Sequence, residues 1–171
     1  MLAKKEFIAI SFLIIHCFIG QSNAQTQPEQ PKKLNQSHAT TGKKLEELLL
    51  CNPSKKFTRA SAKNAFSEIG LLQDKTEIYR PSKDKAPTVF GATIADATIN
   101  TESDASTLSV RVIDQTPEEI AKQLDIKKQR VNGPFGPENI YRKQTSKNSY
   151  IEITPAPSIS PRATSIDCIF F

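Results

Sequence analysis

Apolar residues recur along the chain with two different periods, one helical before residue 70 and one strand-like after it. Four of them share the i, i+3, i+4, i+7 spacing of a single helix face: Ala62, Ala65, Phe66 and Ile69. Asn52 is in an N-cap position, Pro53 suits the first helical position, and Gly70 suits a left-handed C-terminal residue. The pattern predicts a main helix over Pro53–Ile69, preceded by a short helix over Gly42–Leu50.

Period-two alternation after Gly70 predicts strands. It is clearest over Thr107–Ile113, where Leu and Val alternate with Ser and Arg. Weaker strand candidates are Glu77–Tyr79, Thr88–Ala95, Ala97–Ile99, Tyr150–Thr154 and Ser165–Phe171. Gly91, inside the second of these, predicts a bulge or a close backbone approach. We predict an α+β fold, with an antiparallel sheet of about five strands packed by the main N-terminal helix and one further short helix.

That short helix is predicted to begin at Thr116 and to end near Asp125. Thr116 would cap it, Pro117 would take the first helical position, and Glu119 would reach back in a capping box. The alternative is that Glu118 and Glu119 are catalytic acids. Neighbouring helical residues point in different directions, so the capping role is favoured.

The N-terminus has the three parts of a secretion signal. Lys4 and Lys5 form a basic head, Phe7–Ile19 is apolar, and small residues lead to a cleavage site after Ala24. The apolar run is shorter than the roughly 20 residues of a membrane anchor. We therefore predict a signal peptide over residues 1–24, a periplasmic or secreted product, and no membrane span in the mature chain. Cys17 lies inside the signal and would leave with it.

Residues 25–40 are rich in Gln, Pro, Lys and Ser and predict a disordered tether, which leaves 41–171 as a single domain. Asn35 begins a glycosylation sequon within the tether, and its use depends on the source organism.

Two cysteines, Cys51 and Cys168, remain after signal removal and nearly bracket the domain. In an oxidising compartment an even number of cysteines predicts a disulfide, although both thiols could stay reduced. Their separation is too great for a CxxC redox motif. A bridge would place the start of the main helix beside the last strand.

Candidate chemistry is mostly excluded. The two histidines, His16 and His38, lie in the signal and the tether, so a Ser-His-Asp or Cys-His pair cannot be built on the domain. No glycine-rich phosphate loop or metal-ligand spacing is present, and we predict no catalytic, cofactor or metal residues. A net charge of +5 is too mild to indicate nucleic-acid binding. What survives is a carboxylate pair of the kind that glycosidases use, or a bare Ser-Lys arrangement.

Residues 127–148 form the most basic stretch, with a turn-rich Asn132–Pro137 segment at its centre. Aromatic and cationic side chains on such a loop are typical of a binding surface. The predicted partner-binding set is Phe135, Tyr141, Arg130, Arg142 and Lys143. The alternative is that Phe135 points inward as an anchor of the loop and the cations face water.

These observations predict an exported, non-catalytic binding module, such as an inhibitor, an immunity-type protein or an envelope accessory factor. Its partner would be a protein or an envelope component. The alternative is a small exported hydrolase that uses paired carboxylates. The sequence leaves the partner's identity and the oligomeric state open.

Overall fold

Antiparallel strands dominate the part of the chain that the structure describes. This structure, a computed structural model, describes residues 42–171 except for 102–103 and 134–135. The predicted signal peptide and tether lie outside these residues. The helices are α1 (Lys43–Leu49), the 3-10 helix η1 (Pro53–Lys55), α2 (Arg59–Glu68) and α3 (Pro117–Gln123). The strands are β1 (Leu71–Gln73), β2 (Tyr79–Pro81), β3 (Thr88–Val89), β4 (Ala92–Asn100), β5 (Ser106–Val112), β6 (Lys128–Gly133), β7 (Gly136–Ser146), β8 (Ser149–Pro155) and β9 (Thr164–Phe170).

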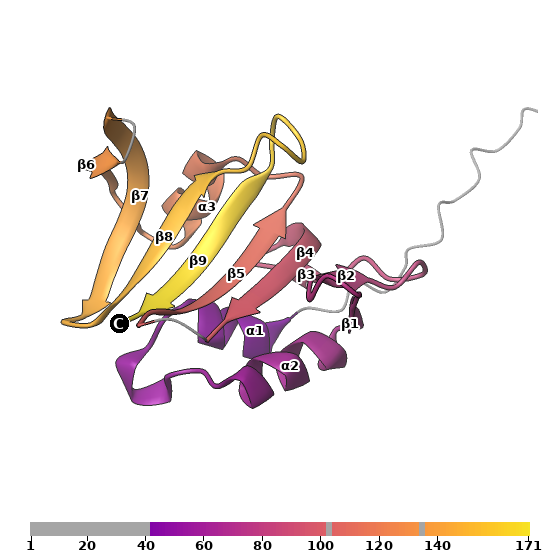
Figure 1. The fold of residues 1–171 in the computed structure, drawn as a ribbon. Helices are drawn as coiled ribbons and strands as arrows, with labels where there is room; N and C mark the ends of the chain where they lie inside the picture. Colours follow the sequence, from indigo (N-terminus) through magenta and orange to yellow (C-terminus); the bar gives the residue numbers. More distant parts are fainter. Residues whose placement is uncertain (1–41, 102–103, 134–135) are drawn as a thin grey trace, which may run out of the picture. The chain divides into compact units, whose positions relative to one another are not determined.

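One twisted sheet contains all nine strands, in the order β1-β2-β4-β5-β9-β8-β7-β6, with β3 paired to β4 (Figure 1). Strand β9 lies in the middle and pairs along its whole length with β5 on one side and β8 on the other. Strand β6 forms one edge of the sheet, and β7 is the one described strand with which it pairs. None of the described helices is long and apolar enough to cross a bilayer.

The predicted main helix is split in two, which corrects the expectation of one helix over Pro53–Ile69. Asn52 caps only the 3-10 turn η1, through its side chain and the Ser54 amide. Phe57 then turns into the core, and Thr58 and Ser61 form a capping box that starts α2 anew. The apolar face predicted for this region is correct, since Ala62, Ala65 and Phe66 are the buried residues of α2.

The sheet has nine strands instead of the predicted five. Short edge strands account for part of the difference. The segment around Gly91 is a tight turn between β3 and β4, where Phe90 and Gly91 both have positive φ, instead of a bulged strand. The larger correction is the basic stretch 127–148, which forms the β6–β7 hairpin. Its strands show little apolar alternation because most of their side chains are exposed on both faces.

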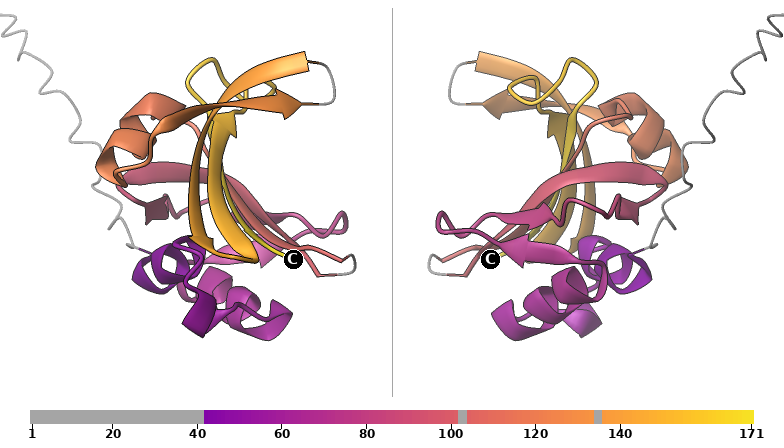
Figure 2. Two further views of the ribbon diagram at one scale, coloured as in Figure 1. Left: turned by 90° about the vertical axis from the view of Figure 1, so that its left-hand side faces the viewer. Right: turned by 90° about the vertical axis from the view of Figure 1, so that its right-hand side faces the viewer.

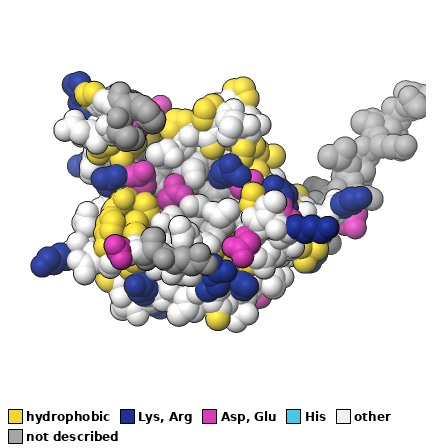
Figure 3. Space-filling view, in the orientation of Figure 1, with side chains coloured by type: hydrophobic (Ala, Val, Ile, Leu, Met, Phe, Trp, Pro, Cys, Tyr) yellow, Lys and Arg dark blue, Asp and Glu magenta, His cyan; other side chains and the backbone are white. Residues whose placement is uncertain are grey.

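The two faces of the sheet differ in composition. On the core face, alternate residues of the central strands are buried under the helices: Leu108, Val110, Val112, Ile151, Ile153, Ile166, Cys168 and Phe170. In Figure 2, α1 and α3 lie on the same side of these strands. The opposite face, here called the polar face, carries half-buried polar and charged residues. Figure 3 shows acidic and basic side chains interspersed across it.

The Cys51–Cys168 disulfide is present, as predicted, with a Cα–Cα distance of 5.3 Å. It joins the segment after α1 to the central strand β9, and both cysteines are completely buried. Phe57 packs edge-on against Phe170 beside it, with ring centroids 5.8 Å apart. The bridge therefore locks the N-terminal helical segment onto the middle of the sheet.

Candidate functional site

Three of the predicted partner-binding residues, Arg130, Tyr141 and Lys143, share one face of a hairpin, and Arg142 lies on the other face. Arg130, Tyr141, Arg142 and Lys143 all lie on the β6–β7 hairpin, but neighbouring residues of a strand point to opposite faces. Tyr141 pairs with Ile153 and packs against the core, so it and Lys143 belong to the core face. Arg142 belongs to the polar face. Phe135 lies outside the described residues, in the connection between β6 and β7.

Arg142 is already engaged within the protein. Its guanidinium forms an ion pair with Glu152, its cross-strand neighbour on β8, and lies over the Tyr150 ring at 4.4 Å from the centroid. The side chain is only 30% exposed. A guanidinium held by both a carboxylate and an aromatic ring stabilises the hairpin against β8, so we remove Arg142 from the candidate binding residues.

Tyr141 instead lines a cleft between α3 and the outer strands, which we call the Tyr141 cleft. Its volume is about 280 Å³, and it is lined by Thr116, Pro117, Glu118, Lys128, Asn139, Tyr141 and Pro155. The Tyr141 ring and the two prolines form an apolar wall, and the other four residues supply polar groups. An apolar wall with a few converging polar groups is the usual composition of a binding site.

Register explains why strands β6 and β7 contribute to the same cleft. Lys128 is directly opposite Tyr141, and Arg130 is opposite Asn139. Opposed residues of an antiparallel pair point to the same face, as do residues two apart on one strand. All four side chains therefore lie on the face of the hairpin that continues the core face beyond α3.

The polar groups of this cleft are available to a ligand. Within the described ranges, Glu118, Lys128, Asn139 and the Tyr141 hydroxyl form no side-chain hydrogen bond or ion pair. Glu118, Lys128 and Asn139 are also exposed. A ligand with complementary groups would replace only water at these atoms.

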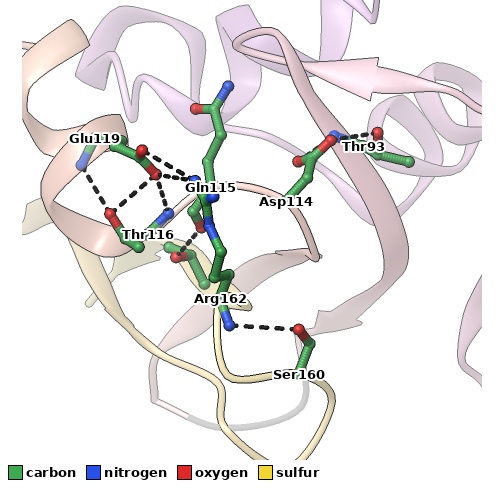
Figure 4. A network of polar contacts seen from close by, with 8 residues as sticks. Thr93, Asp114, Gln115, Thr116, Glu119, Ser160 and Arg162 are labelled. Carbon is green, nitrogen blue, oxygen red and sulfur yellow. Dashed lines mark hydrogen bonds and ion pairs between the residues drawn. The ribbon is translucent and has the colours of Figure 1, made fainter. Parts of the chain in front are cut away.

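A polar network holds the α3 wall of the cleft in place (Figure 4). The Thr116 and Glu119 side chains form the predicted capping box, with hydrogen bonds of 2.7 Å from the Thr116 amide and 3.3 Å from the Glu119 amide. Arg162, from the β8–β9 loop, donates to both Glu119 carboxylate oxygens at 3.0 Å. The hydrogen bonds from the Thr116 amide, the Thr116 hydroxyl and Arg162, in that order, lower the pKa of Glu119. Glu119 therefore acts in capping, and neither glutamate has the environment of a buried catalytic acid.

Two further contacts tie the connection between β5 and α3 to the sheet. The Thr93 amide and hydroxyl donate to Asp114 at 2.9 and 2.6 Å, and the Thr164 hydroxyl donates to the Gln115 carbonyl at 2.7 Å. Figure 4 shows Asp114 hydrogen-bonded to Thr93, and Thr116 hydrogen-bonded to Glu119. The backbone that carries Pro117 and Glu118 is thus fixed at several points, which favours a pre-formed cleft.

A second cleft, of about 340 Å³, lies between α1 and α2. Two of its charged lining residues, Lys44 and Glu68, are paired with each other at 2.6 Å. Its polar groups are therefore partly satisfied by the protein itself, unlike those of the Tyr141 cleft.

The polar face contains a carboxylate pair that bears on the hydrolase alternative. Glu152 and Asp167 are cross-strand neighbours on β8 and β9. Burial is the main cause that raises the pKa of Asp167, opposed by hydrogen bonds from Ser109 and Ser165, while Glu152 is paired with Arg142. Two carboxylates in unlike environments are a feature of acid–base sites. Asp96 and Arg111, also on this face, form a two-point ion pair at 2.6 and 2.7 Å.

No cluster of three or more metal-ligating side chains occurs among the described residues. No protein-family model, curated protein or solved structure matches this chain.

Sequence reasoning identified Tyr141 but missed most of the other cleft residues. Lys128 and Asn139 could have been found by treating 127–148 as a hairpin, since that pairing places them beside Tyr141. Pro117 was noted only as the first helical residue, and Glu118 only in the catalytic alternative. Pro155 gave no signal, because its place in the cleft depends on how β8 pairs with both neighbouring strands.

Proposed function

We propose that this chain is an exported, non-catalytic binding module that recognises a protein or envelope component through the Tyr141 cleft. Export, to the periplasm or the medium after cleavage near Ala24, rests on the signal-like N-terminus and agrees with the buried Cys51–Cys168 disulfide. An inhibitor, an immunity-type protein or an envelope accessory factor would each suit this description.

One observation carries the proposal: a cleft walled by one tyrosine and two prolines also presents three polar side chains, Glu118, Lys128 and Asn139, that have no partner within the described part of the chain. On the polar face, by contrast, Arg142 and Glu152 form an ion pair with each other. The cleft also lies beside the basic hairpin. Lys128, Arg130 and Lys143 form no ion pair with any described residue.

The test is affinity capture from the native envelope or medium with the immobilised chain, comparing Tyr141→Ala with Tyr150→Ala. Tyr150 is a matched control because it is a half-buried tyrosine on the opposite face of the adjacent strand. We expect the captured partner to be lost with Tyr141→Ala and kept with Tyr150→Ala, both variants being folded by circular dichroism. Equal capture by the wild type and Tyr141→Ala would contradict the proposed site.

The hydrolase alternative rests on Glu152 and Asp167. It predicts turnover of glycoside substrates that Asp167→Asn abolishes, with the fold intact. Absence of turnover across a panel of polysaccharides and aryl glycosides, together with Tyr141-dependent capture, would favour the binding module.

A further inference from the structure

The edge of the sheet next to the Tyr141 cleft is open. Strand β6 pairs with β7 on one side, and on its other side no described residue hydrogen-bonds to its backbone. Four of its six residues are exposed: Lys128, Gln129, Arg130 and Asn132. An unpaired strand edge presents a row of N–H and C=O groups to which an extended segment can pair.

Charge decides which segment this edge can accept. Lys128 and Arg130 point to the same face as Tyr141, and Lys143 lies on that face of β7. The acid of the hairpin, Glu138, is opposite Val131 and belongs to the other face. Lysine on an edge strand usually opposes pairing with another strand. A second copy of this basic strand would be repelled, whereas a strand with carboxylates opposite Lys128 and Arg130 would be attracted.

We infer that the partner presents an extended acidic segment that adds to β6 as a further strand, beside the Tyr141 cleft. The segment's backbone pairs with the free edge, and its carboxylates contact Lys128 and Arg130. Lys128 lines the cleft as well as the edge, so a long apolar side chain two positions beyond the carboxylate opposite Lys128, on the same face of the segment, reaches the mouth of the cleft. This inference rests on the proposed function and specifies its ligand.

The first test is selection of ten-residue peptides from a random display library on the immobilised chain. We expect enriched peptides to contain two acidic residues two positions apart and a large apolar residue a further two positions along, so that all three side chains point to the face of Lys128 and Arg130. A synthetic copy of the enriched peptide should bind the double variant Lys128→Glu/Arg130→Glu with an affinity lower by about tenfold or more. The control double variant, Lys75→Glu/Lys83→Glu, makes the same charge change at exposed lysines near the other end of the sheet and should bind normally.

The second test is amide hydrogen exchange with and without the enriched peptide. Strand addition should slow exchange in β6 by about tenfold or more, because its free amides become hydrogen-bonded. Three results would overturn the inference: enrichment of basic or uncharged peptides, equal loss of binding in both double variants, or tight binding with unchanged exchange in β6. If capture of the native partner is still lost with Tyr141→Ala, such a result excludes strand addition but leaves the cleft as the proposed binding site.

Discussion

The cross-linked centre of the sheet and the β6–β7 hairpin at its edge are built in opposite ways. Around Cys51 and Cys168, alternate residues of β9 are completely or almost completely buried, and an aromatic pair adds to the packing. In β6 no residue is buried, and in β7 only Ile140 is. Such differences concentrate stability in one region and leave the other free to adjust to a ligand. The contrast agrees with a disulfide that serves the fold and with our proposal that recognition belongs to the hairpin.

Removal of the disulfide should have the largest effect. The bridge closes a loop with a sequence separation of 117 residues, and in the chain-entropy description this stabilises the fold by about 4–5 kcal/mol. The variant Cys51→Ala/Cys168→Ala should lose roughly that free energy of unfolding in urea. A melting temperature equal to that of the wild type, under both oxidising and reducing conditions, would show that the disulfide does not stabilise the centre of the sheet.

A matched pair of truncations tests the burial difference directly. Ile153 is completely buried and Val131 is half-buried on the edge strand. Ile153→Ala should cost about 3 kcal/mol of unfolding free energy through lost burial and a cavity. Val131→Ala should cost less than about 0.5 kcal/mol. Similar losses in chemical denaturation would mean that the hairpin is as tightly packed as the core.

Loss of the α3 cap should affect the cleft more than the fold. Thr116→Ala removes the side-chain acceptor for the Glu119 amide and should lower stability by about 1 kcal/mol. Because Thr116 also lines the cleft, affinity for the partner should fall too. The control Thr58→Ala removes the equivalent cap of α2, far from the cleft, and should lower stability without changing affinity. A Thr116→Ala variant with unchanged affinity would show that the network does not position the cleft wall.

The smallest expected effects are two pH dependences of opposite sign. Burial raises the folded-state pKa of Asp167 above 3.8, so its contribution to stability falls as pH rises through that pKa. Asp167→Asn should therefore be more stable than the wild type at neutral pH, and the difference should shrink below about pH 4.

Hydrogen bonds from Thr116 lower the pKa of Glu119 below 4.5, so its contribution is present at neutral pH and lost in acid. Glu119→Gln should therefore be less stable than the wild type at neutral pH and equal to it in acid. Urea denaturation at several pH values measures both differences. If the stabilities of both variants, each relative to the wild type, change with pH in the same direction, the environment described for Asp167 or for Glu119 is wrong.

Features that depend on local chemistry could be predicted from the sequence. The Thr116 capping box lies within four residues, and the Cys51–Cys168 pairing follows once Cys17 is assigned to the signal. The strongest alternating strand, Thr107–Ile113, was predicted to within a residue at each end. The capping box and the alternating strand are signals carried by a few neighbouring residues, and the distant disulfide could be predicted because only two cysteines were left to pair.

The hairpin and the cleft could not be predicted in the same way. A strand with one buried face shows alternation, but β6 is exposed on most of its residues, and its Gly-Pro connection to β7 indicated a loop. The prediction of one helix over Pro53–Ile69 was wrong for a related reason. Burial of Phe57 is a tertiary contact, and it overrides the local helix propensity. The Tyr141 cleft combines α3, two outer strands and the end of β8, so its composition depends on strand register and on the packing of α3, which are both tertiary features.

The most direct test of the account is hydrogen exchange on the chain bound to its captured native partner. If the hairpin end is the recognition surface, protection will be gained in residues 116–118 and 128–133, while the α1–α2 region and the central strands β5 and β9 remain as in the free chain. Protection gained instead on the α1–α2 helices, or on β9 and β5 across the polar face, would contradict the assignment of recognition to the Tyr141 cleft and its neighbouring edge.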